Sequence, residues 1–327
     1  MGTFILMVIN NMVIGTYMLS PDKFPQQDPL AMAMVAGIGA MLGIMSSLRT
    51  SGGHINPAVT IAFAVTGKLK WRKVPHYIAG QCLGSFTAQV LIFITYYDAF
   101  NALDGGIRSA YGQNTSTAGI FATFPPDHVS LLTAMFDQVF GTAMLLIAVS
   151  AVGDNRGVKL PEFLQPVIIM LLVTALAAGT SHNCGAILNP ARDLIPRVFC
   201  SIAGWGWEVY KPLGGHYWYV AGVIGPIVGA IIGCYTYHVL IGRYLMTDNP
   251  NLQEKSRMTY SEESINNNNL NEGFSIELGD GFVNGTALKP IVDSVDGDFA
   301  RVDKRSQSVS GFPSSRKRHS IQKNFHL

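Results

Sequence analysis

Six long apolar stretches, separated by short polar segments, occupy the first three-quarters of the chain. They lie near residues 2–19, 30–48, 76–97, 130–152, 163–180 and 217–241. An apolar helix of about 20 residues crosses the hydrocarbon core of a bilayer, and each stretch is long enough, or nearly so, to do this. The first stretch lacks the basic start and the clear cleavage site of a signal peptide, so we interpret it as a membrane helix. The pattern predicts an all-α membrane protein with six transmembrane helices.

Two further apolar segments, 57–66 and 190–200, are too short to span a bilayer, and each follows a loop of small residues. The tripeptide Asn-Pro-Ala opens both segments, as Asn56-Pro57-Ala58 and as Asn189-Pro190-Ala191. Asn is favoured as a helix N-cap and Pro at the first helical position, so each tripeptide indicates a helix start. Irregular backbone cannot face lipid, because its polar groups would lack partners there. We therefore expect two re-entrant half-helices inside the protein.

One half-helix in each half of the apolar region indicates an inverted repeat, the first copy about 1–98 and the second about 130–242. In such a repeat the half-helices meet near the bilayer midplane, and each N-terminus presents roughly half a positive charge. The amides of Asn56 and Asn189 add hydrogen-bond donors. A pore with this centre favours water and uncharged hydroxylated solutes, and excludes ions and protons. The alternative is that both tripeptides are ordinary helix starts.

The density of charged residues changes near Gly242. Residues up to Gly242 hold 12 Lys and Arg and 10 Asp and Glu, whereas the remaining 85 residues hold 11 of each kind. This predicts a channel domain over 1–243 and a disordered tail over 244–327. Lys and Arg concentrate in the loops on one side of the six spans, which predicts that both termini are cytoplasmic. The sequon at Asn114 then lies in an outer loop and is a candidate for glycosylation.

Over nearly all of residues 1–242 the chain resembles the major intrinsic protein family, the aquaporins and aquaglyceroporins. Besides the two tripeptides, the matching positions are Gly2-Thr3, Gln81, Gly141-Thr142-Ala143 and Gly225-Pro226. Features similar to the aquaglyceroporin branch are the run from Gly119 to Pro125, Phe136-Asp137-Gln138, Asp193, Arg197 and the run from Ala203 to Gly206. The resemblance implies a homotetramer with a pore for glycerol and water in each subunit. We also predict a plasma-membrane location, urea as a further solute, and no cofactor.

Arg192, directly after the second tripeptide, is the best candidate for a selectivity filter. Its guanidinium offers fixed donors to a hydroxyl and repels cations; the alternative is an arginine that reaches the membrane interface. Aligned spacing from the two tripeptides implies that the other filter positions are Ala36, Ala177 and Ala186. Glycerol channels of the family usually carry aromatic residues at some of these positions. Three small residues therefore imply a wide constriction.

Four further positions have both a functional and a structural interpretation. Asp193 and Arg197 are four residues apart on one helix face and can pair; the resemblance implies that they shape the pore mouth. Tyr96 fits an aromatic position of the branch, and equally an interfacial tyrosine. His54 matches a family histidine of the cytoplasmic vestibule, and a buried, hydrogen-bonded histidine is the alternative.

Other classes of function find less support in the sequence. The histidines show no metal-ligand spacing, no catalytic set of residues is present, and nothing indicates nucleic-acid binding; we predict that the protein is not an enzyme. Two alternatives stay open: a water-selective channel of the same fold, and a non-conducting membrane scaffold or adhesion protein. The scaffold alternative arises because family members bury two glutamates that support the tripeptide loops. In this chain the first position would precede Met1, and the second is occupied by Gln138.

Overall fold

The computed structural model describes residues 1–20, 28–247, 277–278 and 281–282. The chain forms two units, Met1–Thr259 and Tyr260–Leu327. The second unit is described only at a short antiparallel pair, β1 (Glu277–Leu278) and β2 (Gly281–Phe282). Most of the predicted disordered tail, 244–327, lies outside the described residues, so the prediction of disorder stays a prediction.

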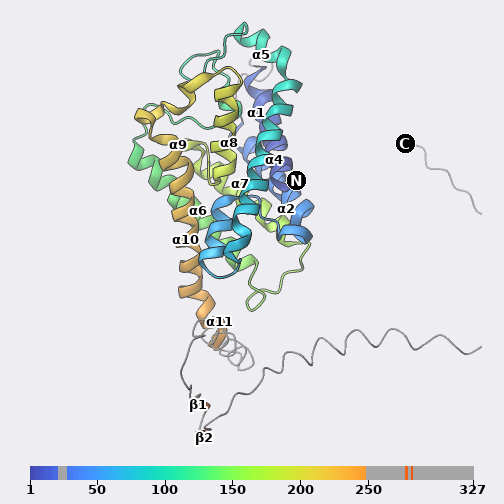
Figure 1. The fold of residues 1–327 in the computed structure, drawn as a ribbon, viewed down its shortest axis with the longest axis vertical. Coiled ribbons are helices and arrows are strands. Elements are labelled where there is room, and N and C mark those ends of the chain that lie inside the picture. Colours follow the sequence, from blue (N-terminus) through green and yellow to red (C-terminus); the bar gives the residue numbers. More distant parts are fainter. Residues whose placement is uncertain (21–27, 248–276, 279–280, 283–327) are drawn as a thin grey trace, which may run out of the picture. The chain divides into compact units, whose positions relative to one another are not determined.

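Long helices dominate the first unit (Figure 1). Among the described residues, five helical segments are long and apolar enough to cross a membrane: Pro29–Ser51 (α2), Trp71–Thr95 (η1 and α4), Leu131–Val152 (α6), Gln165–Cys184 (α7) and Tyr217–Leu245 (α9 to α11). A sixth apolar helix, α1 (Gly2–Met18), has 17 residues. At 1.5 Å per residue it is about 26 Å long. The six predicted spans are therefore present as helices, with α1 shorter than the other five.

The remaining elements are short turns and helices and the separate parts of the composite spans. In chain order, with the parts of the composite spans included, they are η1 (Trp71–Lys73), α4 (Val74–Thr95), α5 (Tyr97–Asp104), η2 (Ala118–Ile120), η3 (Gly206–Tyr210), η4 (Pro212–Gly215), α9 (Tyr217–Tyr219), η5 (Val220–Ile224), α10 (Gly225–Tyr237), η6 (His238–Gly242) and α11 (Arg243–Thr247). Two of them, η5 and η6, are π-helical turns that join α9, α10 and α11 into one span.

Both predicted half-helices form, as α3 (Pro57–Val65) and α8 (Pro190–Ile202). Asn56 and Asn189 are their N-caps, with nearly equal backbone angles (φ −146°, ψ 120° and φ −148°, ψ 109°). The side-chain oxygen of Asn56 accepts from the N–H of Ala58 at 2.9 Å, and that of Asn189 from Ala191 at 3.0 Å. These bonds satisfy amides that would otherwise be orphaned at a helix start.

The helices pack as an inverted repeat. In the first half α1 contacts α2 and α4; in the second half α6 contacts α7 and α10 in the same way. Each half-helix crosses to the other half, so that α3 packs on α10 and α8 on α4. The halves also meet directly through α2 and α7. This exchange of half-helices brings the two tripeptides to one place in the bundle.

Glycines permit the closest helix contacts. A Cβ atom at Gly43 of α2 would come within 2.6 Å of the carbonyl oxygen of Gly2 in α1. A Cβ at Gly229 or Gly233 of α10 would overlap the backbone of α6. Small residues at four-residue spacing let membrane helices approach closely enough for van der Waals packing to hold them. The glycine pair of α10 thus fixes its distance from α6.

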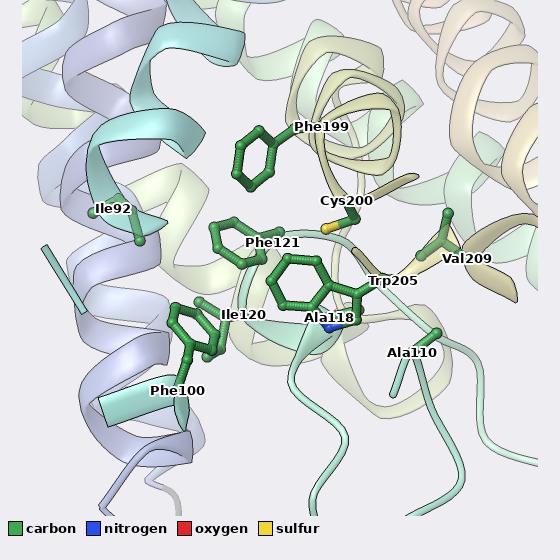
Figure 2. Packing of buried hydrophobic residues seen from close by; sticks show 10 residues of the cluster. All are labelled: Ile92, Phe100, Ala110, Ala118, Ile120, Phe121, Phe199, Cys200, Trp205 and Val209. Carbon is green, nitrogen blue, oxygen red and sulfur yellow. The ribbon is translucent and has the colours of Figure 1, made fainter. Parts of the chain in front are cut away.

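An aromatic cluster packs where α4, α5, α8 and the loop around η2 meet (Figure 2). The rings of Phe100, Phe121, Phe199 and Trp205 point toward one another. Phe100 and Phe121 stack with centroids 5.7 Å apart, and the Trp205 ring meets each of them edge-on. Such pairs contribute about 0.5–1.5 kcal/mol each beyond their buried area. The cluster anchors the long loop between α5 and α6, which forms part of the site described next.

Candidate pore

A cavity of about 590 Å³ runs through the first unit, and mainly apolar side chains line it. The predicted pore residues that line it are His54, Asn56, Asn189, Ala36, Ala177, Ala186 and Arg192. Residues from loops on opposite sides of the bundle border the same cavity, Leu48 and Gly153 on the side predicted to be cytoplasmic, Phe124 and Pro126 on the other. The cavity therefore extends along the bundle and joins the positions that the sequence singled out.

Two crossed hydrogen bonds join the tripeptide loops at its centre. Asn56 Nδ2 donates to the carbonyl of Leu188 at 2.9 Å, and Asn189 Nδ2 donates to the carbonyl of Ile55 at 3.0 Å. Each Asn thus caps its own half-helix with its oxygen and binds the opposite loop with its nitrogen. An amide nitrogen carries two hydrogens, so each Asn keeps one donor for the cavity that it lines.

Neighbouring polar side chains hold the first loop. Gln81 of α4 donates to the carbonyl of His54 at 3.2 Å and to Thr60 Oγ1 at 3.0 Å. His54 Nδ1 lies 3.1 Å from the same hydroxyl, and its ring meets those of Phe63 and Tyr77 edge-on. His54 is therefore both a half-buried, hydrogen-bonded histidine and part of the cavity wall.

The second loop carries backbone strain and a matching polar support. Ala186 and Leu188 have φ values of 51° and 50°, in the left-handed region that non-glycine residues seldom adopt. Gln138 Oε1 accepts from the N–H of Leu188 at 2.9 Å, and Gln138 Nε2 donates to Asp137 at 2.7 Å. Asp137 also accepts from Asn183 Nδ2 at 3.1 Å. Gln138 therefore binds the loop backbone through its neutral amide.

Arg192 lines the cavity and keeps one guanidinium nitrogen buried without a hydrogen-bond partner in the described part of the chain. Its side chain is 14% exposed, its Nη1 atom has no hydrogen-bond partner among the described residues, and Asp193 lies 4.0 Å from it. A buried guanidinium donor without a partner is costly. The exposed part of the side chain lies among the residues that line the cavity, so the remaining guanidinium N–H groups are the donors available there.

Asp193 and Arg197 form a buried pair that binds the outer loop. Arg197 Nε donates to Asp193 Oδ2 at 2.8 Å, and both side chains are fully buried. Asp193 Oδ1 accepts from the backbone N–H and the hydroxyl of Thr123, at 2.8 and 2.7 Å. Arg197 donates to the carbonyls of Thr123 and Val209. The pair therefore fixes Thr123, which itself lines the cavity.

Several predicted residues do not line the cavity. Pro57, Ala58, Pro190 and Ala191 are buried at the starts of the half-helices. Tyr96 is not among the residues that line the cavity; it packs against the aromatic cluster, and its hydroxyl donates to the carbonyl of Met12 at 3.3 Å. Asn114 is exposed in the loop between α5 and α6. Sequence reasoning missed Thr123, whose partner Asp193 is 70 residues away, and Asn10, a cavity-lining residue of α1. Two adjacent asparagines in an apolar span were the available signal for Asn10, because polar side chains in spans usually hydrogen-bond between helices.

A further charged group lies on the opposite side, in the loop after α6. Arg156 donates to Asp154 through Nε at 2.8 Å and Nη2 at 2.6 Å. The hydrogen bond from Arg156 lowers the pKa of Asp154 to about 2. Tyr237 of α10 donates to the same carboxylate at 3.0 Å. Asp154 thus stays ionised near neutral pH and ties this loop to α10.

Comparison with known proteins places this architecture among relatives. The family described as Major intrinsic protein matches residues 1–237. Aquaporin-9 of Homo sapiens is 39% identical over 241 residues, covering 74% of this chain and 80% of that protein. Aquaporin-3 of Milnesium tardigradum is 37% identical over 253 residues, covering 76% and 77%. The X-ray structure of the aquaglyceroporin from Plasmodium falciparum shares the fold, with a TM-score of 0.64 at 23% identity, covering 75% of this chain and 94% of that one.

Proposed function

Since this chain belongs to the major intrinsic protein family, we propose that it is a passive membrane channel for glycerol, other small uncharged solutes and water. The observation that carries this proposal is the single cavity, which Asn56, Asn189 and Arg192 all line. These residues offer hydrogen-bond donors along a mainly apolar wall. A polyol has hydroxyl groups for the donors and a carbon backbone for the wall.

The arrangement of charge accounts for exclusion of ions. The N-termini of α3 and α8 meet at the crossed asparagines, and each contributes roughly half a positive charge. A cation that loses water there faces two positive helix ends and then Arg192. Water that accepts from both asparagines is oriented, which interrupts proton transfer along a file of waters. Neutral solutes meet no such barrier.

The small residues that line the cavity with Arg192 leave room for a solute larger than water. Ala36, Ala177 and Ala186 line the cavity as Arg192 does, and none fills the space that an aromatic ring would take. Asp193 and Arg197 hold Thr123 in the outer wall, so that the loop keeps the mouth open. This width favours glycerol and urea over water alone.

Further properties belong to the same proposal. A multi-pass membrane protein with five long apolar helices and the shorter α1 is expected in the plasma membrane with both termini cytoplasmic, as the distribution of Lys and Arg indicates. We expect a homotetramer with one pore per subunit, glycosylation at Asn114, and no enzymatic activity.

Stopped-flow light scattering on proteoliposomes tests the function. Wild type should pass glycerol and water, and Arg192→Ala should change glycerol flux because it removes the cavity donor. Arg72→Ala, which removes an exposed arginine from η1, is the matched control and should behave as wild type. Water flux without glycerol flux would favour the water-selective alternative. Neither flux, from protein shown to be folded and inserted, would refute the channel and favour the scaffold alternative.

A further inference from the structure

One polar side chain interrupts an apolar stripe on the cavity wall. Leu6, Asn10, Ile14 and Met18 of α1 all line the cavity, and their four-residue spacing places them on one helix face. Asn10 is 8% exposed, and the other three side chains are apolar. An amide on such a face costs free energy unless its polar atoms find partners.

Asn10 begins a chain of hydrogen bonds that leads to the second tripeptide. Its Nδ2 donates to Asn11 Oδ1 at 2.9 Å, and Asn11 Nδ2 donates to Gln89 Oε1 at 2.5 Å. Gln89 Nε2 donates to the carbonyl of Ser85 at 3.0 Å, and Ser85 Oγ donates to the carbonyl of Ala191 at 2.7 Å. Asn11, Ser85 and Gln89 are all buried.

The direction of this chain determines which atom of Asn10 is left over. A carbonyl only accepts, so the Gln89 group that faces Ser85 is the nitrogen. Gln89 then offers its oxygen to Asn11, which must donate its nitrogen and present its own oxygen to Asn10. Asn10 in turn donates its nitrogen, and its Oδ1 atom has no partner among the described residues. The buried chain thus leaves an acceptor at the cavity wall.

The neighbours of α1 fix the level of Asn10 along the pore. Leu6, one turn before Asn10, packs in the same cluster as Ile55 of the first tripeptide loop. A Cβ at Gly15, just over one turn after Asn10, would lie 3.6 Å from Ile120 in the outer loop. One helical turn rises about 5.4 Å. Asn10 therefore lies between the crossed asparagines and the outer end of the cavity.

We propose that Asn10 is a solute-binding station of the pore, where its Oδ1 atom accepts a hydrogen bond from an O–H or N–H group of a small uncharged solute. The inference rests on the proposed function and adds a side-chain acceptor to its side-chain donors. The side chains of Asn56, Asn189 and Arg192 offer a solute only N–H donors, because both asparagine oxygens cap their own half-helices and a guanidinium has no acceptor. A polyol hydroxyl or a urea amide that sheds water must also donate, and Asn10 supplies an acceptor on the α1 stripe.

The test compares glycerol and water flux in the same proteoliposomes. Asn10→Leu keeps the approximate volume and removes the acceptor; glycerol permeability should fall roughly three- to tenfold, the effect of one neutral hydrogen bond, with water permeability within about twofold of wild type. Asn10→Ser retains a hydroxyl and should give an intermediate glycerol value. Met12→Leu, on an exposed part of the same helix, is the control and should match wild type.

Each possible result either supports or overturns the proposed role of Asn10. A selective fall in glycerol flux that Asn10→Ser partly restores supports the station. Unchanged glycerol flux in Asn10→Leu overturns it while leaving the channel function intact. Equal loss of both fluxes in Asn10→Leu and Asn10→Ser, from inserted protein, overturns it in favour of a packing role. A wild-type protein that conducts no glycerol overturns the proposed function and, with it, the station.

Discussion

The fully buried Arg197 offers the sharpest test of the outer pore structure. In Arg197→Met, Asp193 loses its donor at 2.8 Å, and the carbonyls of Thr123 and Val209 lose theirs. The carboxylate keeps the two bonds from Thr123, and Arg192 lies 4.0 Å away. A charge left unpaired after removal of its buried partner destabilises a fold by about 3–5 kcal/mol. We expect a loss of that order.

The partner substitution and the double variant separate pairing from packing. Asp193→Leu leaves the guanidinium of Arg197 without its carboxylate and should cost about the same, roughly 3–5 kcal/mol. The double variant Asp193→Leu with Arg197→Met leaves no unpaired charge, so its loss should be well below the sum of the two single losses. An exposed pair serves as the control: Arg49 and Glu162, 3.4 Å apart, have side chains 89% and 73% exposed. Arg49→Met should cost less than about 1 kcal/mol.

Equilibrium unfolding in mixed micelles, followed by tryptophan fluorescence, measures these differences, and glycerol flux in proteoliposomes shows whether the mouth is altered. Trp205 lies in the aromatic cluster beside Phe121, two residues from Thr123, so its fluorescence reports on the same loop. The reasoning fails if Arg197→Met is no less stable than Arg49→Met. It also fails if the double variant loses the full sum of the single variants, since the two side chains would then act independently.

Ala177→Phe adds a ring to the cavity wall and should lower glycerol permeability severalfold more than water permeability in stopped-flow measurements; equal effects on both would contradict the assigned position. Gly233→Leu places a side chain against the backbone of Ala143 and should lower the yield of folded, detergent-stable protein, by the overpacking that typically costs about 1–3 kcal/mol or more; wild-type stability would show that α10 and α6 are not in contact. The hydrogen bond from Arg156 lowers the pKa of Asp154 to about 2, below the usual value of about 3.9. The ionised carboxylate therefore stabilises the folded loop fully above about pH 4, and this contribution disappears as the pH falls from about 4 through 2. Amide hydrogen exchange in residues 153–164, corrected for intrinsic rates, should therefore show the same protection at pH 8 and pH 5 and less protection below pH 4. A loss of protection between pH 8 and pH 5 would show that Asp154 is not the group whose ionisation stabilises the loop.

The sequence predicted those parts of the fold that depend on local pattern. Apolar length gave the spans, and the Asn-Pro pairs gave the starts of α3 and α8, because capping depends on residues within one turn. Ala36, Ala177 and Ala186, which spacing from the tripeptides suggested as filter positions, line the cavity with Arg192; their role as a filter stays a prediction.

Contacts between distant residues were not predictable in the same way. The carbonyl partners of Asn56 and Asn189 lie 132 and 134 residues away in sequence, and no local pattern encodes such a pairing. The aromatic cluster joins Phe100, Phe121 and Phe199 from three separate segments. For Tyr96 the sequence allowed two locations, because a tyrosine suits both an aromatic position of the branch and the membrane interface. Its packing in the structure places it against the aromatic cluster and not among the residues that line the cavity.

The supports of the two tripeptide loops fit the proposed exclusion of cations, because no Asp or Glu is among the described residues that line the cavity. Gln81 and Gln138 each hold one loop with a neutral amide. Because Gln138 uses its oxygen on Leu188, its nitrogen needs an acceptor, and Asp137 provides it. Neither Asp137 nor Gln138 is among the residues that line the cavity. A negative charge at the cavity wall would offset the positive N-terminal ends of α3 and α8. Asp137 lies behind the neutral amide of Gln138, where it supports the loop and weakens the proposed electrostatic barrier to cations less.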